Sequence, residues 1–304
     1  MLCQPLIGDL TSDSDRARFI AVNISLFYIS CLAALLVIIG LLKLSQSLLM
    51  LSSIIVIGAM FGFTASTFLR KVDETEAIRT SARKPLLPQA RRIFSDVSIR
   101  RQLLAGCVSN LAVIMLVPIS MLTLKRGYGV SDTEALVFAL VQFGACAAMS
   151  LLTGKISEKI GPRKNMLFAY MLLLTVALLW LVVPARLNGF CMAAVFLLCG
   201  GGSVTMENAK VHYFLQTVRP ELRVAASIFI SVATGIGAGV LGMLFSGALL
   251  KWCDPEHLAS PLSGYRLYFL AALPILLPGI WIIARQEPLP MEKRKLKRTW
   301  PIFH

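Results

Sequence analysis

The chain has 304 residues, of which 57% are hydrophobic and 15% are charged, and its formal net charge is +14. Soluble domains carry roughly 25% charged residues, so this composition excludes an ordinary water-soluble domain. About 20 apolar residues are needed to cross a bilayer core as a helix. Charge-free runs of 18 to 27 residues occupy positions 19–42, 44–69, 102–124, 135–153, 165–185, 187–206, 224–250 and 267–284. The sequence therefore predicts an all-α polytopic membrane protein with eight transmembrane helices.

The runs divide the chain into four parts. Two spans fill residues 1–69, a basic segment with amphipathic helix potential fills 70–101, six spans fill 102–284, and a basic tail fills 285–304. Within the six-span part, Ser131 and Glu134 have the spacing of a capping box at the start of a helix. We expect 70–101 to be a cytoplasmic linker between two groups of helices.

The basic residues predict the orientation in the membrane. Of 30 Lys and Arg residues, 24 lie in five segments, which are 1–18, 70–101, 154–164, 207–223 and 285–304. By the positive-inside rule these segments, and both termini, face the cytoplasm of a cell (plasma or inner) membrane. This topology accounts for the net charge without a nucleic-acid partner, and we predict none. The partner it does imply is the lipid bilayer; the tail 291–300 is either solvated or in contact with anionic lipid.

The sequence offers no chemistry of catalysis. The seven cysteines form no CxxC pair, the three histidines are far apart, and there is no GxxxxGK[ST] phosphate loop. We therefore expect no metal site, no cofactor and no catalytic residue. A membrane enzyme would need a polar cluster at a membrane face, and no such cluster is evident.

The stretch GKISEKIGPRK, residues 154–164, separates two of the apolar runs. We expect Gly154 to end one helix in close contact with its neighbours, Gly161 to turn the chain, and Pro162 to enter the first turn of the next helix. The stretch resembles motif A of the major facilitator superfamily, G-x-x-x-[DE]-[RK]-x-G-x-[RK]-[RK]. The matching residues are Gly154, Glu158, Lys159, Gly161, Arg163 and Lys164.

The position of the motif sets the register of the resemblance. It lies between the second and third of the six later spans, where the family carries a second copy of motif A between helices eight and nine. A weaker similarity relates the segment DSDRARF (13–19), before the first span, to PELRVAA (220–226), before the seventh. The family has related Arg-containing segments at the starts of helices five and eleven. The chain thus resembles helices five to twelve, that is, a C-terminal six-helix bundle preceded by the last two helices of the N-terminal bundle.

The resemblance implies secondary transport of a small solute by alternating access between two bundles. Because it does not include the family's first four helices, three readings stay open. The chain is a truncated transporter, a partial transporter completed by a separate chain that supplies four helices, or a transporter-derived fragment or scaffold that does not transport.

The family's motif A carboxylate is thought to hold the opposite bundle in the outward-facing state. By this resemblance Glu158 should lie near the N-terminus of the first span, within reach of Arg16 or Arg18. A helix N-terminus favours a nearby anion by about 0.3–1 kcal/mol. The alternative is a solvated loop that serves only topology.

Polar residues inside spans are the default candidates for a solute cavity. These are Asn23 and Tyr28 in the first span, and Asn110 and Gln142 near the middle of theirs. Interhelical hydrogen bonding is the alternative, and it is the better interpretation for Ser227, Ser231 and Thr234, which share one helix face. We assign Glu207, at the cytoplasmic end of its expected span, to a gate or loop contact. No carboxylate or histidine falls mid-membrane in the expected spans, so the sequence identifies no coupling ion.

Overall fold

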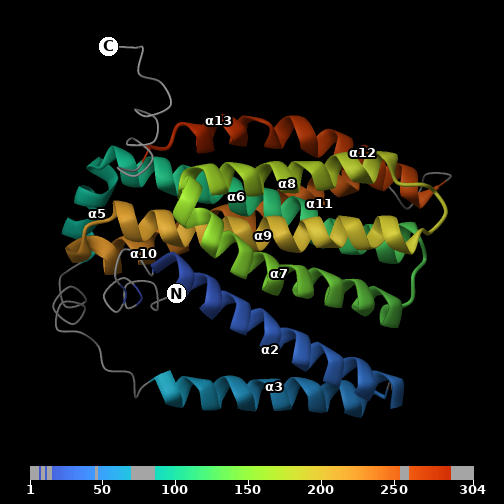
Figure 1. Cartoon of the computed structure of the whole chain (residues 1–304). Helices are drawn as coiled ribbons and strands as arrows, with labels where there is room; N and C mark the ends of the chain where they lie inside the picture. The colour runs from blue at the N-terminus through green and yellow to red at the C-terminus, as the bar shows by residue number, and fades with distance from the viewer. Residues whose placement is uncertain are drawn as a thin grey trace.

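A computed structural model describes residues 16–44, 47–69, 86–253 and 260–288, together with Ile7 and Thr11. Within these residues all regular structure is helical (Figure 1). The elements are α2 (Arg16–Leu44), α3 (Leu48–Leu69), α5 (Leu86–Ser95), α6 (Val97–Leu122), η1 (Thr123–Gly127), α7 (Asp132–Ile160), α8 (Pro162–Val182), α9 (Gly189–Thr217), η2 (Pro220–Leu222), α10 (Arg223–Val232), η3 (Ala233–Val240), α11 (Leu241–Cys253), α12 (Pro261–Leu276) and α13 (Pro278–Ala284).

Seven spans among the described residues are long and apolar enough to cross a membrane. They are Arg16–Leu41, Val97–Gly127, Asp132–Ser157, Pro162–Val182, Gly189–Thr217, Pro220–Cys253 and Pro261–Ala284. Helix α3 contributes a shorter apolar stretch, Ser52–Phe68. The polytopic all-helical fold is confirmed, while the count of eight transmembrane helices stays a prediction.

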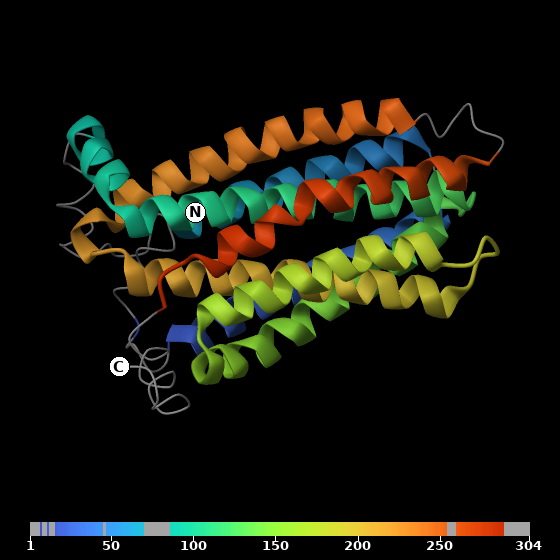
Figure 2. The ribbon, with the colours of Figure 1, turned by 90° about the horizontal axis from the view of Figure 1, so that it is seen from above.

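The helices from α6 to α13 surround one continuous apolar core. Large aromatic side chains fill it, and the Trp180 and Phe269 rings stack with centroids 5.6 Å apart. Both are at most 1% exposed, as are Tyr170 and Phe196. Seen from above, the long helices of this bundle run roughly side by side (Figure 2). Close packing of this kind gives the bundle a defined shape on which a solute site can be held.

Helix α2 lies obliquely against α7, and α3 lies on its outer side (Figure 1). Helices α2 and α7 approach each other closely at Gly154, which has no side chain. A Cβ atom added there would lie 2.4 Å from the Ala21 Cβ. Ser150 donates a hydrogen bond to the Ala21 carbonyl at 2.8 Å, and Ser25 donates to the Ala147 carbonyl at 3.1 Å. Small residues and cross-helix hydrogen bonds are the usual means of helix association in membranes.

Several helices extend beyond the limits set by the charge-free runs, among them α6, α7 and α9. Helix α7 continues through the motif to Ile160. The prediction that Gly154 ends this helix is therefore wrong. Helix α9 continues to Thr217 instead of ending at 206, and α6 begins at Val97 within the expected linker. A charged side chain is tolerated in a membrane helix where it is paired inside the protein or reaches the interface, so charge alone does not end a helix.

Several local predictions are confirmed. Ser131 and Glu134 form the capping box of α7, and Pro162 begins α8. Residues 86–95 of the linker form the amphipathic helix α5, in which Ile93 is buried. Residues 70–85 of the linker and 289–304 of the tail lie outside the described residues.

Candidate solute site

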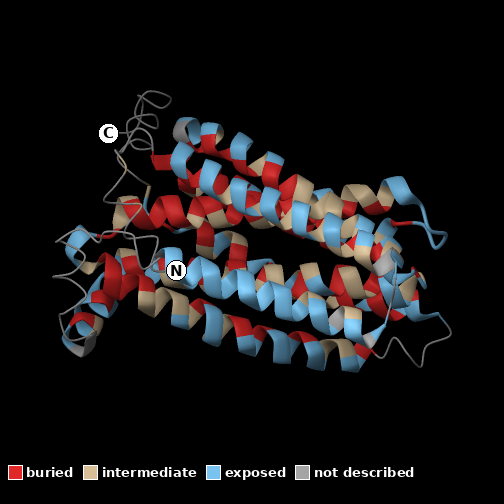
Figure 3. Ribbon diagram, turned by 90° about the horizontal axis from the view of Figure 1, so that it is seen from below, coloured by how far each residue is buried: buried red, intermediate tan, exposed pale blue. Residues whose placement is uncertain are grey.

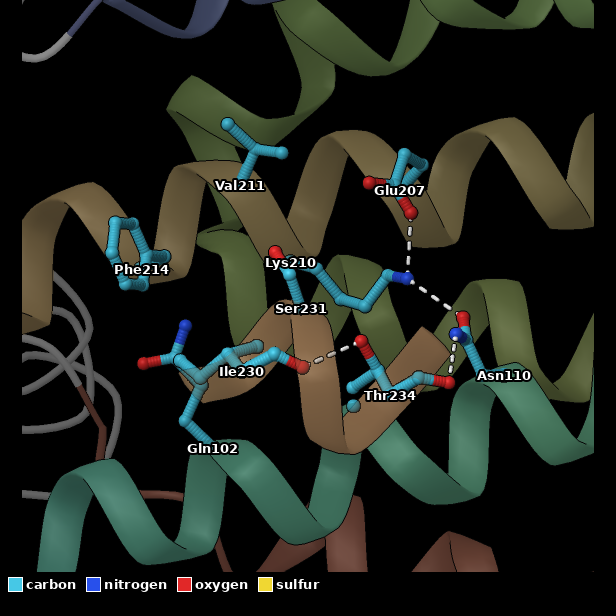
Figure 4. A pocket seen from close by; sticks show the side chains of 10 residues that line it. Gln102, Asn110, Glu207, Lys210, Val211, Phe214, Ile230, Ser231 and Thr234 are labelled. Carbon is cyan, nitrogen blue, oxygen red and sulfur yellow. Dashed lines mark hydrogen bonds and ion pairs between the residues drawn. The ribbon is translucent and has the colours of Figure 1, made fainter. Parts of the chain in front are cut away.

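A pocket lies between α6, α9 and the α10–η3 segment (Figure 4). It is lined by the first half of α6, the last third of α9 and the residues around the junction of α10 with η3. Its cavity volume is about 90 Å³. Ten residues line it: Gln102, Gly106 and Asn110 from α6, Glu207, Lys210, Val211 and Phe214 from α9, and Ile230, Ser231 and Thr234 from α10 and η3. Six of the ten are polar or charged, which is unusual for the interior of a membrane bundle.

The electrostatic centre of the pocket is an ion pair on α9. The Lys210 Nζ lies 2.6 Å from the Glu207 Oε2, three residues back on the same helix, and donates a hydrogen bond to the Asn110 Oδ1 at 3.2 Å. The Lys210 side chain is 19% exposed and that of Glu207 is 46% exposed. Pairing and hydrogen bonding offset the cost of removing both charges from water. The charge of Lys210 and that of Glu207 cancel, so the pair has no net charge.

The wall opposite the ion pair is built from the π-helical segment η3. A π-helix leaves carbonyl groups outside the regular α-helical ladder, and such segments are frequent at functional sites. The Thr234 carbonyl accepts a hydrogen bond from the Asn110 Nδ2 at 3.0 Å, and the Ala233 carbonyl accepts one from the Cys107 thiol at 3.7 Å. Gly106 permits this approach, since a Cβ there would meet the Thr234 Cγ2 at 3.1 Å. Asn110 thus joins η3 to Lys210.

The remaining polar side chains differ in how they are engaged. Thr234 donates to the Ile230 carbonyl of its own helix at 2.7 Å, and Ser227 donates to the Val224 carbonyl at 2.8 Å. Gln102 is 5% exposed, and its Oε1 has no hydrogen-bond partner. A buried polar atom left unpaired is destabilising by about 1–3 kcal/mol, so it marks a place where a ligand atom is expected.

The sequence-based cavity candidates occupy different places. Asn110 lines the pocket. Gln142 lies on α7, and its backbone carbonyl faces Gly200 of α9. A Cβ atom added to Gly200 would lie 2.2 Å from the Gln142 carbonyl oxygen. Asn23 is exposed on α2, and the Tyr28 ring packs against Phe143 with centroids 6.0 Å apart. Among these four candidates, Asn110 alone belongs to the pocket lining.

The sequence analysis assigned Glu207 to a gate or loop contact and did not single out Lys210, whereas the structure places both in the pocket lining as an ion pair. The sequence analysis placed both outside the membrane-spanning part of α9, because it required each span to be free of charge. The available signal was their spacing: opposite charges three residues apart share one side of a helix and neutralise each other. It also missed His212, which is buried on α9 with its Nδ1 2.9 Å from the Ser157 Oγ of α7.

The motif residues lie at the junction of α7 with α8, next to the N-terminal end of α2. Gly161 has a φ of 88°, which suits glycine, and the Cβ position of Gly154 is also 3.4 Å from the Ala17 carbonyl oxygen. The side chain of Glu158 lies outside the described part of the structure.

The other motif and latch residues are placed as follows. Lys159 and Lys164 are exposed, and Arg163 is half-buried. Arg16 is 5% exposed and donates to the Thr11 carbonyl at 3.2 Å, whereas Arg18 is exposed. The latch between Glu158 and Arg16 or Arg18 stays a prediction.

No group of three or more His, Cys, Asp or Glu side chains is arranged to hold a metal ion within the described ranges.

Comparison with known families gives a match over nearly the whole chain. A sequence model described as Major Facilitator Superfamily matches residues 1–240 and, in a second match, residues 103–303. Residues 103–240 lie in both matches, as expected for an architecture built from related halves. A search of curated proteins finds no match.

Proposed function

Because the chain belongs to the major facilitator superfamily, whose members are membrane transporters, we propose that it carries a small solute by a rocking-bundle, alternating-access mechanism. The solute site is the pocket between α6, α9 and η3. The observation that carries this proposal is the ion pair and amide cluster of Glu207, Lys210 and Asn110 around a cavity between membrane-spanning helices.

The architecture supports a movable contact between two groups of helices. Helix α2 meets α7 through small residues, with Gly154 against Ala21, so the seam can slide with little obstruction from side chains. The larger apolar core lies within the bundle and contains no residue of α2, whereas a smaller buried cluster joins Ile20 of α2 to α5, α6, α9 and α10. Movement of the bundle against α2 would have to rearrange this smaller cluster. In this proposal both termini are cytoplasmic and the protein resides in a cell (plasma or inner) membrane.

Alternating access in this proposal requires a second helical bundle that faces the pocket across from α6, α9 and η3. A non-transporting scaffold is the second candidate function, and one observation favours it. The side chains described between 52 and 68 on α3 are nearly all exposed, so α3 offers a broad apolar surface for holding another membrane protein.

Cysteine accessibility separates the two candidates. Ser231 lines the pocket, whereas Leu241, farther along the same span, is 66% exposed on the outer surface. In a background whose native cysteines are replaced, Ser231→Cys should react with a membrane-impermeant maleimide applied from either side of the membrane. Leu241→Cys, the control, should not react from either side because lipid covers it. Reaction of Ser231→Cys from one side alone would contradict alternating access and favour the scaffold.

The same assay tests the latch. Glu158→Gln removes the charge that we propose holds the outward-facing state, so reaction of Ser231→Cys should fall from the outside and rise from the inside. The change should be about two- to fivefold, as expected for loss of 0.3–1 kcal/mol of helix-terminus attraction. An unchanged ratio of outside to inside reaction would leave Glu158 with a topological role only.

A further inference from the structure

We propose that the solute is an anion bearing a carboxylate, which binds Lys210 in place of Glu207, and that the displaced Glu207 then takes up one proton. This inference rests on the proposed function and concerns the same pocket. Glu207 is in this view a resident counter-ion that keeps Lys210 neutralised while the site is empty.

The geometry indicates which partner of the ion pair stays in place. The Lys210 Nζ is held from two sides, by the Glu207 carboxylate at 2.6 Å and by the Asn110 Oδ1 at 3.2 Å. Its side chain is 19% exposed, whereas that of Glu207 is 46% exposed (Figure 4). Glu207 can therefore turn away from Lys210 without breaking another described contact, and Lys210 stays held by Asn110. A cationic solute would need to displace the more deeply buried member, which is less favourable.

The rest of the lining also favours an anion. Asn110 accepts a hydrogen bond from Lys210 with its oxygen and donates one to the Thr234 carbonyl with its amide nitrogen, so its amide plane is fixed between the lysine and η3. Gln102 and Ser231 face the same space and can donate hydrogen bonds. In Figure 4 the Gln102 amide nitrogen lies on the side toward α9. The Gln102 Oε1 accepts no hydrogen bond, so the amide can rotate without losing one at that atom. Its NH₂ group can then donate to a bound carboxylate.

Charge balance explains the proton. The empty pair is neutral, and one bound anion brings the site to a net charge of −1. An unpaired charge within a membrane span is unfavourable by about 2.5–3.5 kcal/mol, so a loaded site in this state would move between the two faces rarely. One proton from solvent on the Glu207 carboxylate restores neutrality. The loaded and empty transporter then carry the same net charge, and solute and proton cross together.

The titratable groups around Glu207 are few. Lys210 on α9 is its direct partner, Tyr28 on α2 lies within electrostatic range of Glu207, and Cys107 on α6 lies within range of Lys210. The lining residues of α10 and η3 are Ile230, Ser231 and Thr234, which carry no charge. Tyrosine and cysteine are neutral at pH 7 in ordinary surroundings, so Glu207 is the group that can accept the proton.

The test uses matched small probes on the full chain in nanodiscs, which have no closed compartment. Propionate, propionamide and propylammonium have nearly the same size but charges of −1, 0 and +1. Propionate should slow alkylation of Ser231→Cys in a concentration-dependent way, and the other two should not. In Lys210→Gln the apparent affinity for propionate should fall about tenfold or more, the loss expected for one charge-assisted hydrogen bond, and Lys210→Arg should restore most of it.

The proton is measured separately. Addition of propionate to weakly buffered wild-type protein should raise the pH of the solution as Glu207 is protonated. Glu207→Gln should bind propionate more tightly, because the competing carboxylate is gone, and should show no pH change. Removal of one partner leaves a lone charge in the bundle, so the double variant Glu207→Gln/Lys210→Gln serves as a neutral control that retains the fold but not propionate protection.

The outcomes separate this inference from the proposed function. Two-sided accessibility of Ser231→Cys without protection by propionate, or with equal protection by propionamide, would overturn the anion assignment and leave transport standing. Protection by propionate without a pH change would overturn the role of Glu207 as proton acceptor. Loss of two-sided accessibility would overturn the proposed function itself.

Discussion

The α9 span buries 56% of its apolar window inside the protein, whereas the α2 span buries 11% of its window. Both are long enough to cross a membrane, and α2, with a mean hydropathy of 2.6, is more apolar than α9, with 1.7. However, α9 packs among helices of the bundle and α2 packs mainly on α7. Seen from below, the side on which α3 lies in Figure 1, much of the ribbon nearest the viewer has the pale blue of exposed residues (Figure 3). Apolar composition is enough to place a helix in the membrane. Whether its side chains are buried inside the protein, and so stabilise the fold, depends on the helices around it.

Truncation of one aromatic ring in each region should show this contrast most strongly. Phe196 is fully buried in the bundle, with its ring centroid 5.7 Å from that of Phe138, and Phe61 on α3 is 73% exposed. Phe196→Ala should lower the free energy of unfolding by about 3–5 kcal/mol, because it leaves a cavity that the packed bundle cannot close. Phe61→Ala should change it by less than about 0.5 kcal/mol. Denaturant titration in mixed micelles measures both. Equal losses would mean that α3 is packed as firmly as the bundle.

The seam between the two regions should respond more moderately. A methyl group at Gly154 would lie 2.4 Å from the Ala21 Cβ, so Gly154→Ala forces α2 and α7 apart and should destabilise the protein by about 1–3 kcal/mol. Gly40, also on α2, has no atom within 4 Å of its Cβ position. Gly40→Ala should therefore stabilise the protein slightly, by up to about 1 kcal/mol, through helix propensity. The sign of the two changes, measured by thermal unfolding, is the decisive result. A stabilising Gly154→Ala would mean that the seam is looser than its geometry indicates.

The smallest effect should come from hydrogen bonding within the bundle. Asn208 on α9 donates to the Ser150 hydroxyl at 3.0 Å and to the Thr153 hydroxyl at 3.1 Å, both on α7. Asn208→Ala should cost about 1 kcal/mol, since such bonds are worth roughly 0.6 kcal/mol each in membranes. Thr175→Ala provides the control, because the Thr175 hydroxyl bonds only its own helix at the Met171 carbonyl. If both variants unfold alike, the contact between α7 and α9 depends on packing alone.

The sequence predicted those parts of the fold that depend on local patterns. Apolar runs located the spans, the amphipathic pattern predicted a short helix somewhere within 70–101, and Ser131, Glu134 and Pro162 marked helix starts. Each of these signals acts within a few residues of the chain, so one sequence is enough to detect it.

The site was predicted in part, through Asn110. Lys210 was missed because its acceptability inside a span depends on Asn110, 100 positions away in the chain, and on Glu207 beside it. The π-helical segment η3 was missed for a similar reason, because its carbonyl groups are satisfied by α6. Interactions of this range leave no local pattern in a single sequence.

Segment η3 also has a consequence for how the chain tolerates changes in length. A regular α-helix turns by about 100° per residue, so a single deletion within Ala233–Val240 that restored α-helical winding would rotate everything after it by about that angle. Ser246 on α11, whose hydroxyl now meets the Tyr268 hydroxyl inside the bundle, would then face lipid. Substitutions along η3 change one side chain, but one lost residue turns all of α11 away from its partners. The spacing between α10 and α11 is thus part of the information that holds the bundle together.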